Sequence, residues 1–240
     1  MSGANIARNL DAVRKTVADA LAKRVNKQTC TLVAVSKTKP IEDLQAAYDH
    51  HQRHFGENYI QELIQKASEL PKDIFWHYIG HVQSNKAKLL VREVSNLYLI
   101  ETVDSVKIAN ALNKASEEFR KPTNPLHILI QVNTSHEVHK NGVNSVEECV
   151  HLAQHIIALC PYLSFKGLMT IGKQGEGASD CFDELQKCRS ILAEKLGLEE
   201  QQLELSMGMS SDFEKAIAHG STLIRIGSTI FGARIYKSEQ

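Results

Sequence analysis

The sequence predicts an α/β protein that folds as a closed (β/α)8 barrel of the TIM type. Eight short apolar or β-rich segments recur along the 240 residues, and segments with helical start signals lie between them. Eight strand–helix units in a chain of about 250 residues are what barrel closure requires. A doubly wound open sheet is the rival fold, but even spacing favours closure. Because no linker rich in Gly, Pro or Ser interrupts the units, we expect residues 1–240 to form a single domain.

An extra amphipathic helix precedes the first predicted strand. Apolar residues recur there at helical spacing: Ile6, Leu10, Val13, Val17 and Leu21. Charged residues interrupt this stretch, so it lacks the continuous apolar core of a signal peptide. No run in the chain approaches the eighteen or so apolar residues that a membrane span requires. We therefore expect a cytoplasmic protein that does not bind membranes.

The first predicted strand, TLVAVSK, shows the pattern of the set: a short apolar run, followed by a turn at Pro40. Seven similar segments follow along the chain. The eight predicted strands span residues 31–37, 53–58, 75–80, 96–103, 127–135, 163–171, 203–209 and 222–228.

Start signals mark several of the helices between these strands. Pro40 opens one helix, and Ser105 stands where it can cap another. The pairs Ser145–Glu148 and Ser211–Glu214 have the spacing of capping boxes. Strands and helices therefore alternate as the barrel requires.

Composition excludes several classes of function. Lys plus Arg and Asp plus Glu both number 28, and a net charge of zero argues against a nucleic-acid-binding protein. The five cysteines are odd in number and show no CxxC spacing, which favours reduced thiols. His151 and His155 have the spacing of two metal ligands on a helix, but no third ligand accompanies them, and we predict no metal site.

Polar residues gather after the last two predicted strands, as Ser210–Ser211 and Gly227–Ser228. Barrels often bind phosphate with the loops after strands seven and eight. Serine hydroxyls and backbone N–H groups can donate to the anion, and a glycine lets the backbone approach it. The structural alternative is that Ser211 only caps a helix and Gly227 only serves a turn. The position of these residues favours the phosphate site.

Arg225 lies between two isoleucines inside the eighth predicted strand, on the same side as Gly227 by strand alternation. An unpaired guanidinium is costly to bury, so Arg225 needs an acceptor. That acceptor is either a protein carboxylate or a ligand heteroatom.

Lys37 ends the first predicted strand and shares a face with Val33 and Val35. A strand-end lysine often only extends its amine into water. If this face lines the barrel interior, partial desolvation favours the neutral amine that forms a Schiff base. An inward lysine, a phosphate site and an inward arginine together indicate pyridoxal 5'-phosphate (PLP). A sugar-phosphate barrel with Lys37 as an aldolase lysine is an alternative that predicts no chromophore.

Six ordered segments resemble the signature segments of a known family: VAVSKTKP, HFGENYIQE, WHYIGHVQSNK, GLMTIG, SMGMSSDFEKAI and STLIRIGSTIFGAR. This is the pyridoxal phosphate homeostasis protein family, also called the proline synthetase co-transcribed homologs. The resemblance runs from residue 32 to residue 234. The family in turn resembles the N-terminal barrel of alanine racemase, a fold-type III PLP protein.

The resemblance implies that Lys37 carries PLP as a Schiff base and that Arg225 lies near the pyridine nitrogen. It implies further residues for the phosphate and the ring: Ser210, Gly227 and Ser228 for the phosphate, and Asn58 and Met169 for the ring. Two positions depart from the family pattern. Ser228 stands where relatives often have Thr, which keeps the hydroxyl, and His136 stands where many members have a smaller residue.

The resemblance also bears on catalysis. An arginine at the pyridine nitrogen leaves that nitrogen largely unprotonated and weakens the ring as an electron sink. Alanine racemase has a C-terminal β-domain that supplies a catalytic tyrosine, whereas this sequence ends at Gln240 soon after the last predicted strand. Two-base racemisation requires a proton donor on each face. We therefore expect a non-enzymatic monomer, without catalytic residues, that buffers PLP or delivers it to PLP-dependent apoenzymes. A PLP-dependent amino-acid racemase is the alternative.

Overall fold

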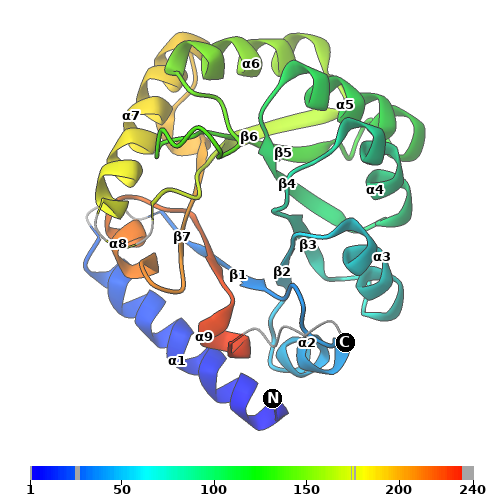
Figure 1. Ribbon diagram of the computed structural model, residues 1–240, viewed down its shortest axis with the longest axis vertical. Coiled ribbons are helices and arrows are strands. Elements are labelled where there is room, and N and C mark those ends of the chain that lie inside the picture. The colour runs from blue at the N-terminus through cyan, green and yellow to red at the C-terminus, as the bar shows by residue number, and fades with distance from the viewer. Residues whose placement is uncertain (1, 25–27, 174, 176, 234–240) are drawn as a thin grey trace.

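A closed barrel of eight parallel strands forms the centre of the computed structural model, which describes residues 2–24, 28–173, 175 and 177–233 (Figure 1). The strands are β1 (Thr31–Val35), β2 (His54–Glu57), β3 (Phe75–Tyr78), β4 (Leu97–Val103), β5 (Leu126–Gln131), β6 (Leu163–Met169), β7 (Glu204–Met209) and β8 (Leu223–Ile226). They follow one another around the ring in sequence order, and β8 pairs with β1. The predicted (β/α)8 barrel is confirmed.

The strands end earlier than predicted where polar residues follow them. β1 ends at Val35, because the chain turns through Ser36 and Lys37. β8 ends at Ile226, because Ser228 already belongs to the next helix. Lys37 and Ser228, which the sequence pattern assigns to strand ends, therefore lie just beyond the carboxyl ends of β1 and β8, in a turn and at the start of α9.

Helices surround the barrel on the outside (Figure 1). They are α1 (Gly3–Ala22), α2 (Ile41–Asp49), α3 (Ile60–Glu69), α4 (Ala87–Glu93), α5 (Val106–Phe119), α6 (Val146–Leu159), α7 (Ala178–Leu196), α8 (Phe213–Ala218) and α9 (Ser228–Phe231), with 3-10 turns at Ser84–Lys86 and Glu200–Gln202. Among the described residues, none of these helices is long and apolar enough to cross a membrane.

The N-terminal helix completes the outer layer. Within the described part of the chain, β8 is followed by one helix, α9, of 4 residues. α1 packs against α2, α8 and α9, and so occupies the place of an outer helix between α8 and α2 (Figure 1). Its buried face consists of Ile6, Leu10, Val13 and Val17, as the sequence pattern predicts. Burial of each such side chain contributes about 1.5–3 kcal/mol as an upper estimate.

The predicted helix starts are confirmed at two serines and wrong at a third. The hydroxyl oxygens of Ser105 and Ser145 each accept a hydrogen bond from the N–H three residues later, at 3.4 and 3.2 Å. The capping box predicted at Ser211–Glu214 does not form, because α8 begins after Asp212. The Asp212 carboxylate instead accepts the N–H of Met209 at 2.6 Å, which ties the start of α8 to the end of β7.

Aromatic side chains fill the end of the barrel at which the strands begin. His54 stacks on Phe75 with ring centroids 4.7 Å apart, and Tyr98 meets His127 edge to face at 5.0 Å. His77 is fully buried behind them. A cavity of about 230 Å³ lies among these side chains. We call this end the barrel floor, defined by His54, Phe75, His77, Tyr98 and His127.

The floor histidines predict how stability changes with pH. Burial lowers the pKa of both His54 and His127 to about 4. Between pH 6.5 and 4 the unfolded chain therefore binds protons that the folded chain does not, and stability is lost as the pH falls through this window. Because both imidazoles keep some contact with water, we expect a loss of roughly 1–2 kcal/mol for each.

Urea unfolding at several pH values between 7.5 and 4 measures this loss. The double variant His54→Asn/His127→Asn should show a flatter dependence than the wild type, while His151→Asn, on the exposed side of α6, should leave it unchanged. An unchanged slope in the double variant would contradict the prediction.

Candidate functional site

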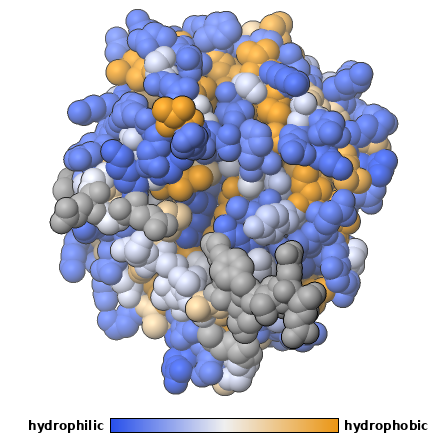
Figure 2. Space-filling model, viewed as in Figure 1, coloured by the Kyte–Doolittle hydropathy of each residue, from blue (hydrophilic) through white to orange (hydrophobic). Residues whose placement is uncertain are grey.

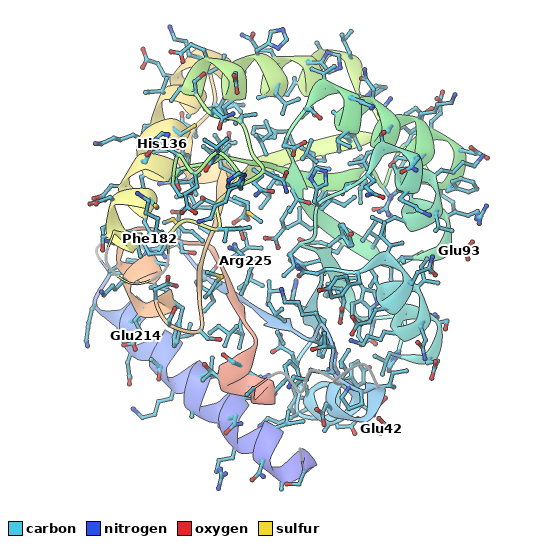
Figure 3. All side chains as sticks on the ribbon, in the orientation of Figure 1. Glu42, Glu93, His136, Phe182, Glu214 and Arg225 are labelled. Carbon is cyan, nitrogen blue, oxygen red and sulfur yellow. The ribbon has the colours of Figure 1, made fainter. Side chains whose placement is uncertain are left out.

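A cavity of about 260 Å³ lies where β1, β7 and β8 end, at the small end of the range for small-molecule sites. We call it the mouth cavity. Figure 2 shows the face of the molecule that Figure 1 views, and the side chains on this face are largely polar, with apolar side chains between them. Arg225 lies near the middle of the ring in Figure 3. The lining consists of Val35, Lys37, Lys39, Ile79, Met209, Ser210, Ser211, Arg225, Gly227, Ser228 and Gly232.

The mouth cavity brings together five of the seven residues predicted to bind the cofactor: Lys37, Ser210, Arg225, Gly227 and Ser228. Lys37 is more than 170 positions away from the other four residues in the sequence. β1 and β8 are neighbours in the barrel, with Val33 opposite Arg225. Barrel closure is therefore what places Lys37 beside Arg225 and the two serines.

Asn58 and Met169 do not belong to this lining. Met169 is 1% exposed and packs inside the barrel with Val33, Leu99, Leu129 and Leu223. Asn58 follows β2, and its backbone oxygen accepts a hydrogen bond from the hydroxyl of Tyr78 at 3.0 Å. The side-chain oxygen of Asn58 is buried and has no hydrogen-bond partner among the described residues.

Lys37 lies on the face that sequence alternation assigns to it. Val33, two residues before Val35, packs in the barrel interior, and Val35 and Lys37 line the mouth cavity. The turn closes where the N–H of Lys39 donates to the oxygen of Ser36 at 3.0 Å. Thr38 has a φ of 64°, a left-handed conformation that is uncommon for a residue other than glycine.

A buried charge cluster holds both residues that flank Lys37. The hydroxyl of Ser36 donates to Glu57 at 2.6 Å, and the N–H of Thr38 donates to Glu62 at 2.6 Å. The ammonium of Lys66, on α3, binds Glu57 at 2.8 Å, Glu62 at 2.6 Å and the oxygen of Ser36 at 2.8 Å. Burial raises the pKa of Glu57 to about 6, although Lys66 opposes the shift. The cluster therefore offsets the strain of the turn.

Arg225 is held from the inside of the barrel. Its guanidinium donates to the hydroxyl of Ser206 at 2.5 Å and to the oxygen of Thr170 at 2.8 Å, and lies 3.8 Å from the carboxylate of Glu101. Burial lowers the pKa of Arg225, and Glu101 and Asp212 oppose this shift. The sequence leaves two kinds of partner open for Arg225, a protein carboxylate or a ligand atom. Glu101 is the protein carboxylate that faces it. A guanidinium carries five N–H groups, so these contacts leave others for the cavity.

Glu101 joins Arg225 to the barrel floor. Its carboxylate accepts hydrogen bonds from His77 at 2.8 Å and from the hydroxyl of Ser206 at 2.5 Å. His77 shares a further hydrogen bond of 2.9 Å with His54. Although burial raises the pKa of Glu101, the contacts with His77, Arg225 and Ser206 leave it below its usual value. We call His54, His77, Glu101, Ser206 and Arg225 the buried polar chain.

The predicted phosphate residues lie together after β7 and β8. The N–H of Gly227 donates to the hydroxyl oxygen of Ser210 at 3.2 Å, and Ser228 begins α9. Gly227 has a φ of −115°, which any residue can adopt. A Cβ on Gly227 would lie 3.2 Å from the oxygen of Val35, a tight contact that a small shift of β1 would relieve, so glycine favours the close approach of β8 to β1.

Four residues that shape this site do not stand out in the sequence. Glu57, Glu62 and Lys66 fall on a strand end and a helix that look ordinary, and Glu101 is a single charge inside a long apolar strand. A charge within a buried strand is a signal that could identify Glu101. In the part of the chain that the structure describes, no group of three or more His, Cys, Asp or Glu side chains has an arrangement that could hold a metal ion.

Known proteins resemble the chain over nearly its whole length. Residues 5–235 match the family model described as the N-terminal domain of alanine racemase. The pyridoxal phosphate homeostasis protein of Mus musculus is 46% identical, over 96% of this chain and 87% of its own length. That of Haemophilus influenzae is 39% identical, over 98% and 99%.

The chain belongs to the pyridoxal phosphate homeostasis protein family. The resemblance read from the six sequence motifs is therefore confirmed.

Solved structures extend the comparison. PipY of Synechococcus elongatus, solved with PLP bound, is 32% identical with a TM-score of 0.75, covering 95% of this chain and 100% of that one. Alanine racemase of Corynebacterium glutamicum is 16% identical with a TM-score of 0.72, and the match covers 98% of this chain and 63% of the racemase. The racemase shares the barrel fold of the pyridoxal phosphate homeostasis family.

Proposed function

We propose that this protein binds PLP in the mouth cavity and takes part in intracellular PLP homeostasis. The observation that carries the proposal is the placement of Lys37, Arg225 and the serines at 210 and 228 in the lining of one cavity. PLP combines an aldehyde, an anionic phosphate and a pyridine nitrogen, and these residues offer an amine, hydroxyl donors and a buried guanidinium. The name of the homologues and the bound PLP in PipY support the same ligand.

Each residue has a distinct role in this proposal. Lys37 would hold PLP through its neutral amine, a group that can bond reversibly to an aldehyde with the loss of one water molecule. The donors at Ser210, Gly227 and Ser228 bind the phosphate. Arg225 is oriented by Ser206, Thr170 and Glu101 toward the ring nitrogen. Met169 and Asn58 support the ring side of the site from positions outside the lining.

We propose further that the protein stores or delivers PLP and is not an efficient enzyme. Racemisation needs an acid or base on each face of the substrate carbon. Besides Lys37, the described lining contains one other amine, Lys39, and two backbone oxygens engage its ammonium. The distant racemases share only the barrel fold with this chain. A cytoplasmic monomer that transfers PLP to apoenzymes is the form we expect.

Transfer to a PLP-dependent apoenzyme tests this function. Protein loaded with PLP and freed of excess ligand should reactivate the apoenzyme up to one equivalent, whereas protein first reduced with borohydride should reactivate none. Peptide mapping of the reduced protein should place the pyridoxyl adduct on Lys37. Loss of the α-proton from amino acids in deuterated water at enzymatic rates would contradict the non-enzymatic role.

A further inference from the structure

Lys39 is the second lysine of the mouth cavity, after Lys37, and the proposed function gives it no role. It lies two residues beyond Lys37 and lines the same cavity. Its ammonium donates to the backbone oxygens of Gly232 at 3.1 Å and Ala233 at 2.8 Å, just after α9. An ammonium has three N–H groups, so one remains beyond these two contacts. Among the described residues no carboxylate lies within ion-pair distance of it, so no acidic side chain in that part of the chain neutralises its positive charge.

A phosphate bound at these donors would be stabilised by a nearby positive charge. A phosphate monoester carries a charge of about −1.5 to −2 at pH 7. The hydroxyls of Ser210 and Ser228 are neutral, and Arg225 already faces Glu101 at 3.8 Å. Asp212, only 7% exposed, adds a carboxylate directly after Ser210 and Ser211, which follow β7. An anion bound here would therefore meet repulsion that neutral donors do not offset.

Backbone geometry places Lys39 on the phosphate side. Gly232 and Ala233 directly follow the short helix that Ser228 begins, and the N–H of Gly232 donates to the oxygen of Ser228 at 2.9 Å. The ammonium is therefore fixed against the same segment that carries a phosphate donor. Lys37, by contrast, follows β1 directly, where the aldehyde would attach.

We propose that Lys39 recognises the phosphate and makes the site select phosphorylated over unphosphorylated pyridoxal. This inference rests on the proposed function, since it assigns the ligand's phosphate to the end of the cavity at α9. A hydrogen bond to a charged group is stronger than one between neutral groups, so Lys39 contributes a large part of the preference for the phosphate.

Paired titrations with two aldehydes test the proposal. Wild-type protein, Lys39→Met and Lys39→Arg are each titrated with PLP and with pyridoxal, which lacks the phosphate, and the absorption of the adduct gives the dissociation constants. Lys39→Met should weaken PLP binding about ten- to hundredfold and change pyridoxal binding less than about twofold. Lys39→Arg should retain most of the PLP affinity, because it keeps the charge. Inorganic phosphate should compete with PLP less effectively in Lys39→Met.

The control is Lys15→Met, which removes one positive charge from α1, where the side chain of Lys15 is 78% exposed. It should bind both aldehydes as the wild type does. Equal weakening of PLP and pyridoxal by Lys39→Met would show a structural role and overturn the inference, as would unchanged PLP binding. A wild-type protein that forms no adduct with either aldehyde would overturn the proposed function and this inference together.

Discussion

Replacement of Lys37 by alanine is expected to abolish covalent capture of PLP. The reaction requires a primary amine at the mouth of the barrel, and the buried charge cluster fixes the turn that carries Lys37. Lys39 lies in the same cavity, but its ammonium is held by the backbone oxygens of Gly232 and Ala233. The phosphate donors remain in the variant, so weak reversible binding should persist without an adduct.

Absorption spectra and borohydride reduction followed by intact-mass measurement check this outcome. The wild type should gain one pyridoxyl group per chain, and Lys37→Ala should gain none under the same conditions. Lys37→Arg is the matched control, since it keeps a positive charge but its guanidinium stays protonated and does not form the bond. A stoichiometric adduct in Lys37→Ala would contradict the assignment of Lys37 as the residue that captures PLP.

Replacement of Glu101 by leucine is expected to cost about 3–5 kcal/mol of unfolding free energy. Glu101 is fully buried and is the carboxylate that faces Arg225 in the barrel interior. Without it, the guanidinium loses its opposite charge, and the hydrogen bonds from His77 and Ser206 lose their acceptor. An uncompensated buried charge is one of the few causes of such a large effect.

Urea unfolding at pH 7.5 measures the loss. Glu101→Gln keeps the shape and one acceptor oxygen, so it should be less destabilised than Glu101→Leu. Glu117→Leu, on the exposed side of α5, should change the unfolding free energy by no more than about 0.5 kcal/mol. If Glu101→Leu proved as stable as Glu117→Leu, the buried polar chain would have no part in holding the barrel together.

The barrel could be predicted because its signals are local. An apolar run such as residues 31–35 identifies a strand without knowledge of its neighbours. In the same way, a serine such as Ser145 marks the start of the helix that follows it. The strand ends are less well predicted, since a polar residue can extend a strand or begin a loop. Lys37 illustrates this: alternation identifies its face correctly although β1 ends two residues earlier.

The supporting residues of the site could not be predicted in the same way. Lys66 binds Glu57 and Ser36 only because α3 packs against the end of β2, and nothing in the spacing of the three residues indicates it. Glu101 and Arg225 are 124 positions apart and meet only across the closed barrel. Contacts that depend on closure have no periodic pattern in the chain.

The barrel floor affects how a ligand enters and leaves the mouth cavity. Between the mouth cavity and the floor cavity stand the buried polar chain and packed aromatic rings, so a small molecule at the mouth does not leave through the floor. Two occupants cannot pass each other in one opening. Exchange is therefore sequential: the first molecule must depart before the next arrives. A competing aldehyde at high concentration can refill the vacated cavity, but it cannot hasten the departure that limits the rate.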